Sequence, residues 1–225
     1  MVSRNELLEY AKQLNITGIS KMSKSQLLKE IGDEKASRYV RIRQLGDKGR
    51  DAITYLVSYE DKQYAMKTFK PRKSSSKISD EINLQTRMSK VSPVIFDFDL
   101  DRKYIVMDKL DRHLVDITSR VLSISLNHQK QLINIYKEMD SQGVFHGDAN
   151  PLNYMIKGRK LYVIDFGMSK TITPQLIKKL GTSTPNIDIM TLGMVLKLRS
   201  IGYTKQSYSY LVNYIDPRVC EQLGL

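Results

Sequence analysis

Three oxygen-bearing side chains stand close together in the second half of the sequence. Asp148 and Asn153 lie five residues apart in "HGDANPLN", and Asp165 opens "DFG" after a short apolar run. A hard cation such as Mg²⁺ is held in nucleotide sites by one or two carboxylates together with phosphate oxygens and water. A further carboxylate can then accept or orient the proton of an attacking hydroxyl. This spacing therefore indicates a metal–phosphate site suited to phosphoryl transfer.

A strand-rich region upstream supplies a cation for such a site. Lys67 follows Ala65 and Met66 on an apolar strand, where a lysine needs either an anion or a route to water. Glu81, in the first turns of a following helix over 78–88, is the natural partner for a buried lysine. Alternation with a period of two predicts strands over 39–45, 52–57, 63–69, 94–100 and 103–108.

The turn between the first two strands contains Gly46 and Gly49. Glycine lets backbone N–H groups approach phosphates closely, although a hairpin turn requires glycine for its own geometry as well. The turn is therefore a weak phosphate-binding signal by itself. Downstream, a helix over 126–142 with Leu132, Ile135, Tyr136 and Met139 on one stripe ends at Gly143, a further helix starts near Asp188, and short helices follow over 203–225.

The first 32 residues have a different pattern. Ser3 with Glu6 and Ser23 with Gln26 form two capping boxes, each followed by apolar residues at helical spacing. Gly32 stands where a C-cap glycine is expected. The pattern resembles the SAP and Rho N-terminal helix-pair modules, which commonly bind nucleic acid. Residues 3–32 also fit a protein-docking or purely structural extension, and the sequence leaves these alternatives open.

The composition sets broad limits. The chain has 225 residues, 41% of them hydrophobic, which is typical of a globular protein. The net charge of +12 favours anionic partners such as nucleotides, nucleic acid or acidic proteins. A single cysteine excludes an internal disulfide and suits a reducing compartment. No apolar run approaches 18 residues, so we expect a soluble intracellular protein with no membrane partner.

The order of these motifs resembles the protein-kinase superfamily over about residues 39–200. The glycine turn, Ala-x-Lys, a helical glutamate, His-Gly-Asp-x4-Asn and Asp-Phe-Gly occur in the order of that family's signature. The resemblance implies an α+β, two-lobed protein-kinase-like fold, with a five-stranded antiparallel N-lobe carrying one helix and a reduced helical C-lobe. It divides the chain into a helical module (1–35) and a minimal kinase domain (36–225), with lobes over about 36–110 and 111–225.

The same resemblance implies ATP and Mg²⁺ as cofactors and assigns roles by position. Asp148 would act on the substrate hydroxyl, Lys67 would bind the α- and β-phosphates and pair with Glu81, and Asn153 and Asp165 would hold Mg²⁺. His146 is interpreted as a structural residue of the loop. The nucleotide contacts implied are Gly46, Gly49, Ile53, Ala65, Lys67, Met107, Asp108, Leu110, Met155 and Ile164.

Several departures from the family pattern define the subtype. Gly147 replaces the usual arginine, as in the small atypical kinases of the RIO type, the kinase of the KEOPS complex and aminoglycoside phosphotransferases. Asn150 replaces a lysine, and no Ala-Pro-Glu follows Asp165. The stretch "NIDIMTLG" is similar to the family's D-x-W-S-x-G helix, with Met190 for tryptophan. A compact kinase domain after a SAP-like module is also similar to kinases of large DNA viruses.

These features favour a serine/threonine protein kinase that is active without phosphorylation of its activation loop. Its expected substrates are proteins, including basic or nucleic-acid-associated ones, with DNA or RNA contact through residues 3–32 as a further hypothesis. Two alternatives stay open: a small-molecule kinase similar to the aminoglycoside phosphotransferases, and a non-catalytic nucleotide-binding scaffold.

Overall fold

The computed structural model describes residues 3–115 and 123–225 of the chain. The chain forms two compact units, one of Met1–Ser75 with Phe96–Lys109 and one of Ser76–Ile95 with Leu110–Leu225. No helix in the described part is both long and apolar enough to cross a membrane.

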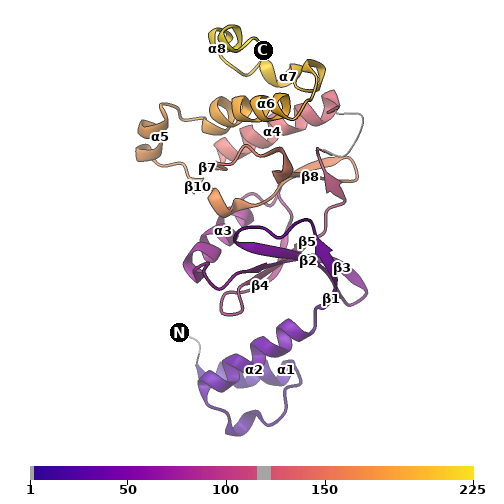
Figure 1. Cartoon of the computed structure of the whole chain (residues 1–225). Helices are drawn as coiled ribbons and strands as arrows, with labels where there is room; N and C mark the ends of the chain where they lie inside the picture. The colour runs from indigo at the N-terminus through magenta and orange to yellow at the C-terminus, as the bar shows by residue number, and fades with distance from the viewer. Residues whose placement is uncertain (1–2, 116–122) are drawn as a thin grey trace. The chain divides into compact units, whose positions relative to one another are not determined.

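The first unit begins with a pair of helices that lie side by side (Figure 1). They are α1 (Arg4–Gln13) and α2 (Lys24–Ser37), with a short 3₁₀ turn, η1 (Ile19–Lys21), between them. Both predicted capping boxes are present, because Ser3 and Glu6 exchange hydrogen bonds, as do Ser23 and Gln26. The pair has a small core of its own, made of Leu7, Ala11, Leu27 and Ile31.

The prediction that Gly32 ends the second helix is wrong. Helix α2 continues to Ser37, and Gly32 lies inside it. A Cβ atom at this position would lie 1.8 Å from Nη1 of Arg102. The Arg102 guanidinium crosses the helix here and donates to the Lys29 carbonyl and to the Asp33 carboxylate. Glycine at this position therefore leaves room for the Arg102 side chain and does not mark a helix terminus.

A five-stranded antiparallel sheet forms the rest of this unit, as predicted. The strands run in the order β1-β2-β3-β5-β4 and are β1 (Val40–Leu45), β2 (Ala52–Tyr59), β3 (Lys62–Phe69), β5 (Tyr104–Asp108) and β4 (Ile95–Asp99). Residues directly opposite in an antiparallel pair share a face. Ala65 lies opposite Leu56 and Met107, whereas Met66 lies opposite Tyr55 and therefore on the other face.

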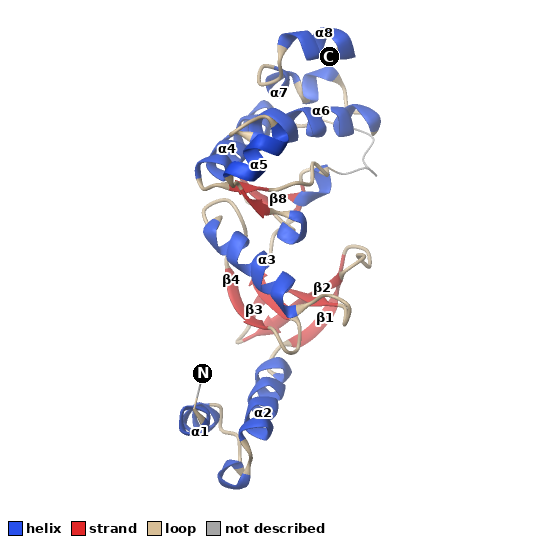
Figure 2. Cartoon of the chain, turned by 90° about the vertical axis from the view of Figure 1, so that its left-hand side faces the viewer, coloured by secondary structure: helices blue, strands red, loops and turns tan. Residues whose placement is uncertain are grey.

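The second unit is mainly helical around short strands (Figure 2). Its core brings α4 together with Phe166 and with Met194 and Leu198 of α6. All four residues of the predicted α4 stripe are buried, which confirms that helix. The elements are α3 (Ser75–Arg87), β6 (Arg112–His113), α4 (Leu126–Ser141), β7 (Val144–Phe145), η2 (Pro151–Asn153), β8 (Tyr154–Lys157), β9 (Lys160–Val163), η3 (Phe166–Met168), β10 (Lys170–Thr171), α5 (Pro174–Leu180), the π-helical turn η4 (Asn186–Met190), α6 (Thr191–Ser200), η5 (Lys205–Ser207), α7 (Ser209–Val212) and α8 (Pro217–Leu223).

The contact at Gly32 makes a prediction about stability. Alanine is favoured over glycine inside a helix by about 1 kcal/mol. In wild type we expect Gly32→Ala to lose this gain, because the new methyl group displaces Arg102 from its two acceptors. In an Arg102→Ala background the same substitution should stabilise the protein. Denaturant titrations of wild type, the two single variants and the double variant measure the free energy of unfolding of each. An equal effect of Gly32→Ala in the wild-type and Arg102→Ala backgrounds would contradict the prediction.

Candidate active site

The loop after β7 joins the predicted catalytic aspartate to the predicted metal-binding asparagine. The Nδ2 atom of Asn153 donates to Oδ2 of Asp148 at 2.9 Å. The Oδ1 atom of Asp148 accepts the backbone N–H of Asn150 at 3.1 Å, which fixes the carboxylate on its own loop. Because the Asn153 amide nitrogen is used by Asp148, the amide oxygen is the atom with which this residue can bind a cation.

Asn150 has a structural function in this loop. Its side-chain oxygen accepts the N–H of Leu152 at 3.1 Å and so caps the short helix η2. The amide therefore supports the backbone between Asp148 and Asn153.

Asp165 adopts a left-handed backbone conformation, with φ of 63° and ψ of 74°. This region is unusual for a residue other than glycine, and such strain collects at functional sites. The Asp165 side chain is exposed and accepts the N–H of Gly167 at 3.3 Å. Phe166 is buried beside it, with its ring 5.5 Å from the His146 ring in an edge-to-face contact. The buried ring holds the segment while the carboxylate stays accessible.

His146 is a structural residue, as predicted. It is fully buried, and burial lowers the pKa of its imidazole, which is therefore neutral near pH 7. Its Nδ1 lies 3.1 Å from the carbonyl oxygen of Asp148 and its Nε2 lies 3.0 Å from that of Ile164. Only one of these nitrogens carries a hydrogen in the neutral ring. The ring thus lies between the loop of Asp148 and the strand that leads to Asp165.

Gly147 is required by the backbone geometry. Its φ is +78°, and a Cβ atom here would lie 3.0 Å from the carbonyl oxygen of Met168. Two further contacts hold the segments together at this point: β7 pairs with β10, and the Ser169 hydroxyl donates to the His146 carbonyl at 3.2 Å. An arginine at position 147, as in most relatives of the resembled family, does not fit this arrangement.

Asn186 and Asp140 form a buried network behind the same loop, and sequence reasoning missed both. The Asn186 side chain accepts the N–H of His146 at 3.0 Å and donates to the Val144 carbonyl at 2.7 Å. It also donates to the Asp140 carboxylate at 2.6 Å, and that carboxylate accepts the N–H groups of Asn186 and Ile187. Burial raises the pKa of Asp140, while these hydrogen bonds oppose the rise.

The motif similarity explains why this network was missed. The similarity of "NIDIMTLG" to D-x-W-S-x-G directs attention to Asp188, two residues after Asn186. Asp188 instead accepts hydrogen bonds from the hydroxyls of Thr182 and Thr184. The glycine of the motif does have a role near the site, because a Cβ atom on Gly193 would lie 2.7 Å from the Cβ of Ala149.

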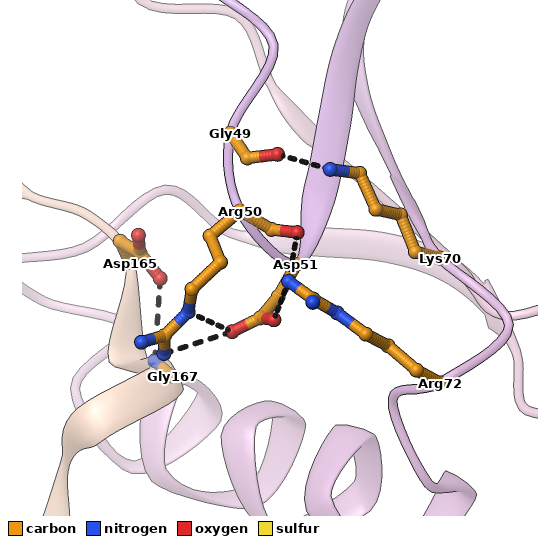
Figure 3. A network of polar contacts seen from close by, with 7 residues as sticks. All are labelled: Gly49, Arg50, Asp51, Lys70, Arg72, Asp165 and Gly167. Carbon is orange, nitrogen blue, oxygen red and sulfur yellow. Dashed lines mark hydrogen bonds and ion pairs between the residues drawn. The ribbon is translucent and has the colours of Figure 1, made fainter.

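In the first unit, a polar network holds the glycine turn (Figure 3). The Gly49 carbonyl accepts from Lys70 at 2.7 Å. Asp51 accepts from Arg50 at 3.1 and 3.2 Å and from Arg72 at 3.0 Å, and the Arg50 guanidinium lowers the pKa of this carboxyl. Gly46 has a φ of +64° and open space around it. The turn is thus a hairpin held by hydrogen bonds from the side chains of Arg50, Lys70 and Arg72.

The sheet register decides which predicted nucleotide contacts share a face. Ala65 and Met107 are directly opposite one another, and Lys67 follows on the same face two residues later. Ile53 lies opposite Thr68 and so on the other face from Ala65. The register therefore does not bring Ile53 together with Ala65. On β2 it is Leu56 that lies opposite Ala65.

The remaining predicted residues are distributed over both units. Asp108 ends β5 in the first unit, opposite Tyr64. In the second unit Glu81 of α3 is almost fully buried, Leu110 is buried, and Met155 and Ile164 are half-buried. Ile164 donates its N–H to the Asn153 carbonyl at 2.8 Å, so this residue directly supports the loop.

The donor set fits a magnesium nucleotide. One exposed carboxylate, Asp165, and the amide oxygen of Asn153 are oxygen donors of the type that Mg²⁺ takes when phosphates and water complete its shell. Asp148 is held beside Asn153 and can accept a proton from an attacking hydroxyl.

Comparison with known proteins supports parts of this interpretation. Residues 3–38 match the family described as Rho termination factor, N-terminal domain. The stress-activated protein kinase JNK of Suberites domuncula is 26% identical over 64% of this chain and 45% of its own length. A candidate serine/threonine-protein kinase, L673, of Acanthamoeba polyphaga mimivirus is 30% identical over 54% of this chain and 25% of its own. The chain thus spans less than half the length of these relatives.

Solved structures show the class of fold. The kinase PK-1 of the Cydia pomonella granulovirus superposes with a TM-score of 0.52, with 18% identity over 65% of this chain and 60% of that one. Together with the five-stranded sheet and the helical second unit, this similarity shows that the chain has an α+β protein-kinase-like fold.

The constraint on Gly147 can be measured against a matched glycine. Gly158 has a φ of +61° and no atom within 4 Å of its added Cβ. Gly158→Ala should therefore lower the free energy of unfolding by about 1–2 kcal/mol, the cost of the left-handed backbone conformation for a residue with a Cβ atom. Gly147→Ala should destabilise the protein more, because the methyl group also meets the Met168 carbonyl. Equal free energies of unfolding for the two variants would contradict this explanation.

The network at Asn186 makes a separate prediction. Asn186→Ala leaves the His146 N–H, the Val144 carbonyl and the Asp140 carboxylate without their shared partner, and should cost about 2–4 kcal/mol of stability. Hydrogen exchange should rise in residues 144–150 before it rises elsewhere. Asn213→Ala, at an exposed asparagine, is the matched control. Unchanged protection of residues 144–150 in Asn186→Ala would contradict the assignment.

Proposed function

We propose that this chain is an ATP- and Mg²⁺-dependent protein kinase that transfers the γ-phosphate to a serine or threonine hydroxyl. The hydrogen-bonded pair of Asp148 and Asn153 is the observation that carries the proposal. This pair supports the proposal because a carboxylate that can accept a proton is hydrogen-bonded to an amide whose oxygen can bind a cation, on a loop held by buried contacts. The kinase-like fold and the names of the relatives support the same activity.

Each proposed residue has a physical role. Asp148 orients the acceptor hydroxyl and receives its proton, while Asn153 and Asp165 would hold the metal. The metal, when bound, neutralises charge on the phosphates. Lys67 binds the α- and β-phosphates, and Glu81 fixes the lysine by charge pairing. Catalysis of this kind depends on positioning and electrostatic stabilisation, which explains why the loop is so strongly anchored.

The adenine contacts are proposed from residues of both units. Ala65 and Met107 share a face of the sheet, with the backbone of Asp108 and Leu110 reading the base edge, and Met155 and Ile164 contribute from the second unit. Gly46 and Gly49 are proposed near the phosphates, although the Gly49 carbonyl is used by Lys70. Leu56 replaces Ile53 in this proposal because of the register.

The subtype and the substrates are further parts of the proposal. Gly147 leaves no arginine for a phosphorylated activation loop, which favours a compact kinase, similar to the RIO and KEOPS types, that needs no such switch. The match of residues 3–38 supports the use of a helical module (1–35) beside a kinase domain (36–225) to recruit nucleic-acid-associated proteins. The similarity to the mimivirus protein is consistent with a viral relationship.

Transfer of labelled γ-phosphate to a mixed protein substrate tests the activity. Asp148→Asn should reduce transfer about 10²- to 10⁴-fold, the range for loss of a catalytic acid–base group. Asp165→Asn should also reduce transfer, through loss of a carboxylate that would hold the metal. Asp101→Asn, at an exposed carboxylate of the first unit, should leave transfer unchanged. Thermal shifts with ATP and Mg²⁺ show whether binding persists. Equal transfer by wild type and Asp148→Asn would exclude this site, and binding without any transfer would favour the non-catalytic scaffold.

A further inference from the structure

The face of the sheet opposite Lys67 carries an unusual number of aromatic rings. Tyr39 and Tyr104 are buried there with Met66, and this cluster also contains Val57 and Val106. The two tyrosine rings lie 6.2 Å apart, edge to face. Every residue of this cluster belongs to the first unit.

One carboxylate anchors the inner rings. Asp97 accepts the hydroxyl of Tyr39 at 2.9 Å and that of Tyr104 at 3.4 Å. Arg38 donates to the same carboxylate at 3.0 Å. The negative charge of Asp97 is therefore balanced, and the inner rings form a fixed base for the residues around them.

Outside this base, three rings form a ledge. Tyr64 stacks on Phe96 with centroids 4.9 Å apart, and Tyr59 lies 6.1 Å from Phe96. The ledge is continuous with the base, because Tyr59 is 5.5 Å from Tyr39. Phe96 is 50% exposed, which is a large apolar surface to leave in water on a strand. We call Tyr59, Tyr64 and Phe96 the aromatic ledge.

Two arginine side chains lie over tyrosine rings of this face. Arg38 lies over Tyr59 at 4.9 Å, and Arg41 lies over Tyr55 at 4.6 Å. Arg41 is exposed, and within the described residues it forms no ion pair. Its charge is thus available to an anion.

A cavity of about 220 Å³ opens beside the ledge. Tyr39 contributes to its wall, so the cavity and the ledge meet at this ring. Among the described side chains, Thr68 has a hydroxyl that is buried without a hydrogen-bond partner. The lining contains no carboxylate and consists of Tyr39, Arg41, Met66, Thr68, Arg102 and Tyr104. Arg102 is already paired with Asp33 and Asp99, so the exposed Arg41 guanidinium and the unpartnered Thr68 hydroxyl are the groups that suit a phosphate.

We propose that this face binds single-stranded nucleic acid, with one backbone phosphate in the cavity and neighbouring bases on the aromatic ledge. Proteins that hold single strands combine cationic groups for the backbone with exposed rings on which bases stack. The bases must be unpaired to present their faces, which excludes a duplex. The volume suits a phosphate with part of its sugar, and is small for a whole ligand of ordinary size. The cavity borders the helix pair, because Arg102 in its wall donates to the Lys29 carbonyl, whereas the aromatic ledge is made of residues outside 3–32.

Fluorescence anisotropy of the full chain with a labelled oligothymidylate of about 15 nucleotides, near the upper site size of one single-strand domain, tests the proposal. Phe96→Ala should weaken binding about five- to tenfold, and Phe96→Tyr, which keeps the ring, should retain it. Arg41→Gln should also weaken binding and should lower the slope of log affinity against log salt by about 0.7. Both positions are exposed, so folding should survive.

Matched variants distinguish binding at this face from non-specific attraction to the positively charged chain. Arg43 is exposed on the same strand but lies opposite Leu56, on the other face of the sheet. Arg43→Gln should leave the affinity and the salt slope unchanged. A Lys21→Gln, Lys24→Gln double variant removes charge from the helix pair alone. The assay needs no catalysis, so its result is independent of the proposed kinase activity.

Several outcomes would overturn the proposal. Equal weakening by Arg41→Gln and Arg43→Gln would show non-specific attraction to the basic chain. Loss of binding only in the Lys21→Gln, Lys24→Gln variant would assign it to the helix pair. Tighter binding of the matching duplex would exclude the stacking ledge. Displacement of the oligonucleotide by a phosphoserine peptide at equal concentration, without effect of Phe96→Ala, would assign the cavity to a phosphorylated protein.

Discussion

Buried polar side chains hold the loop that carries Asp148 through hydrogen bonds to its backbone. The positions of the proposed catalytic and metal-binding side chains depend on these hydrogen bonds. His146 and Asn186 reach backbone groups on both sides of the loop, and Asp140 holds Asn186 in place. Each of these groups would be costly to bury without its partner. The network therefore specifies one loop conformation, in which Asp148 and Asn153 are hydrogen-bonded to each other.

Close approaches by other parts of the chain explain glycines at three positions, of which Gly147 departs from the pattern of the resembled family. Gly147 allows the Met168 carbonyl to lie against the loop, and Gly193 admits Ala149. Gly32 has the same function in the helix pair, where Arg102 crosses α2. At these positions the absence of a side chain allows two segments that are distant in sequence to approach closely. Glycine at position 147 thus allows the loop of Asp148 and Asn153 to pack against the segment that follows Asp165.

Much of the fold was predictable because local patterns agree with it. Period-two alternation gave the five strands, and the capping residues Ser3 and Ser23 located two helix starts. Long-range contacts were not predictable: Gly32 was misassigned because Arg102 is 70 residues away. Ile53 was placed beside Ala65 because the pairing of β2 with β3 cannot be deduced from either strand alone, and Asn186 was overlooked because its hydrogen-bond partners lie 40 to 46 residues earlier in the chain.

Asn153, on the anchored loop, and Asp165, on the segment after β9, are proposed to hold one metal–nucleotide complex. Electron paramagnetic resonance of Mn²⁺ with ATP tests it directly, because the signal of the free ion falls as the metal binds. We expect wild type to deplete free Mn²⁺ only when ATP is present, and Asp165→Asn to abolish this depletion while the fold is retained. Equal depletion by wild type and Asp165→Asn, or none by wild type, would contradict the account.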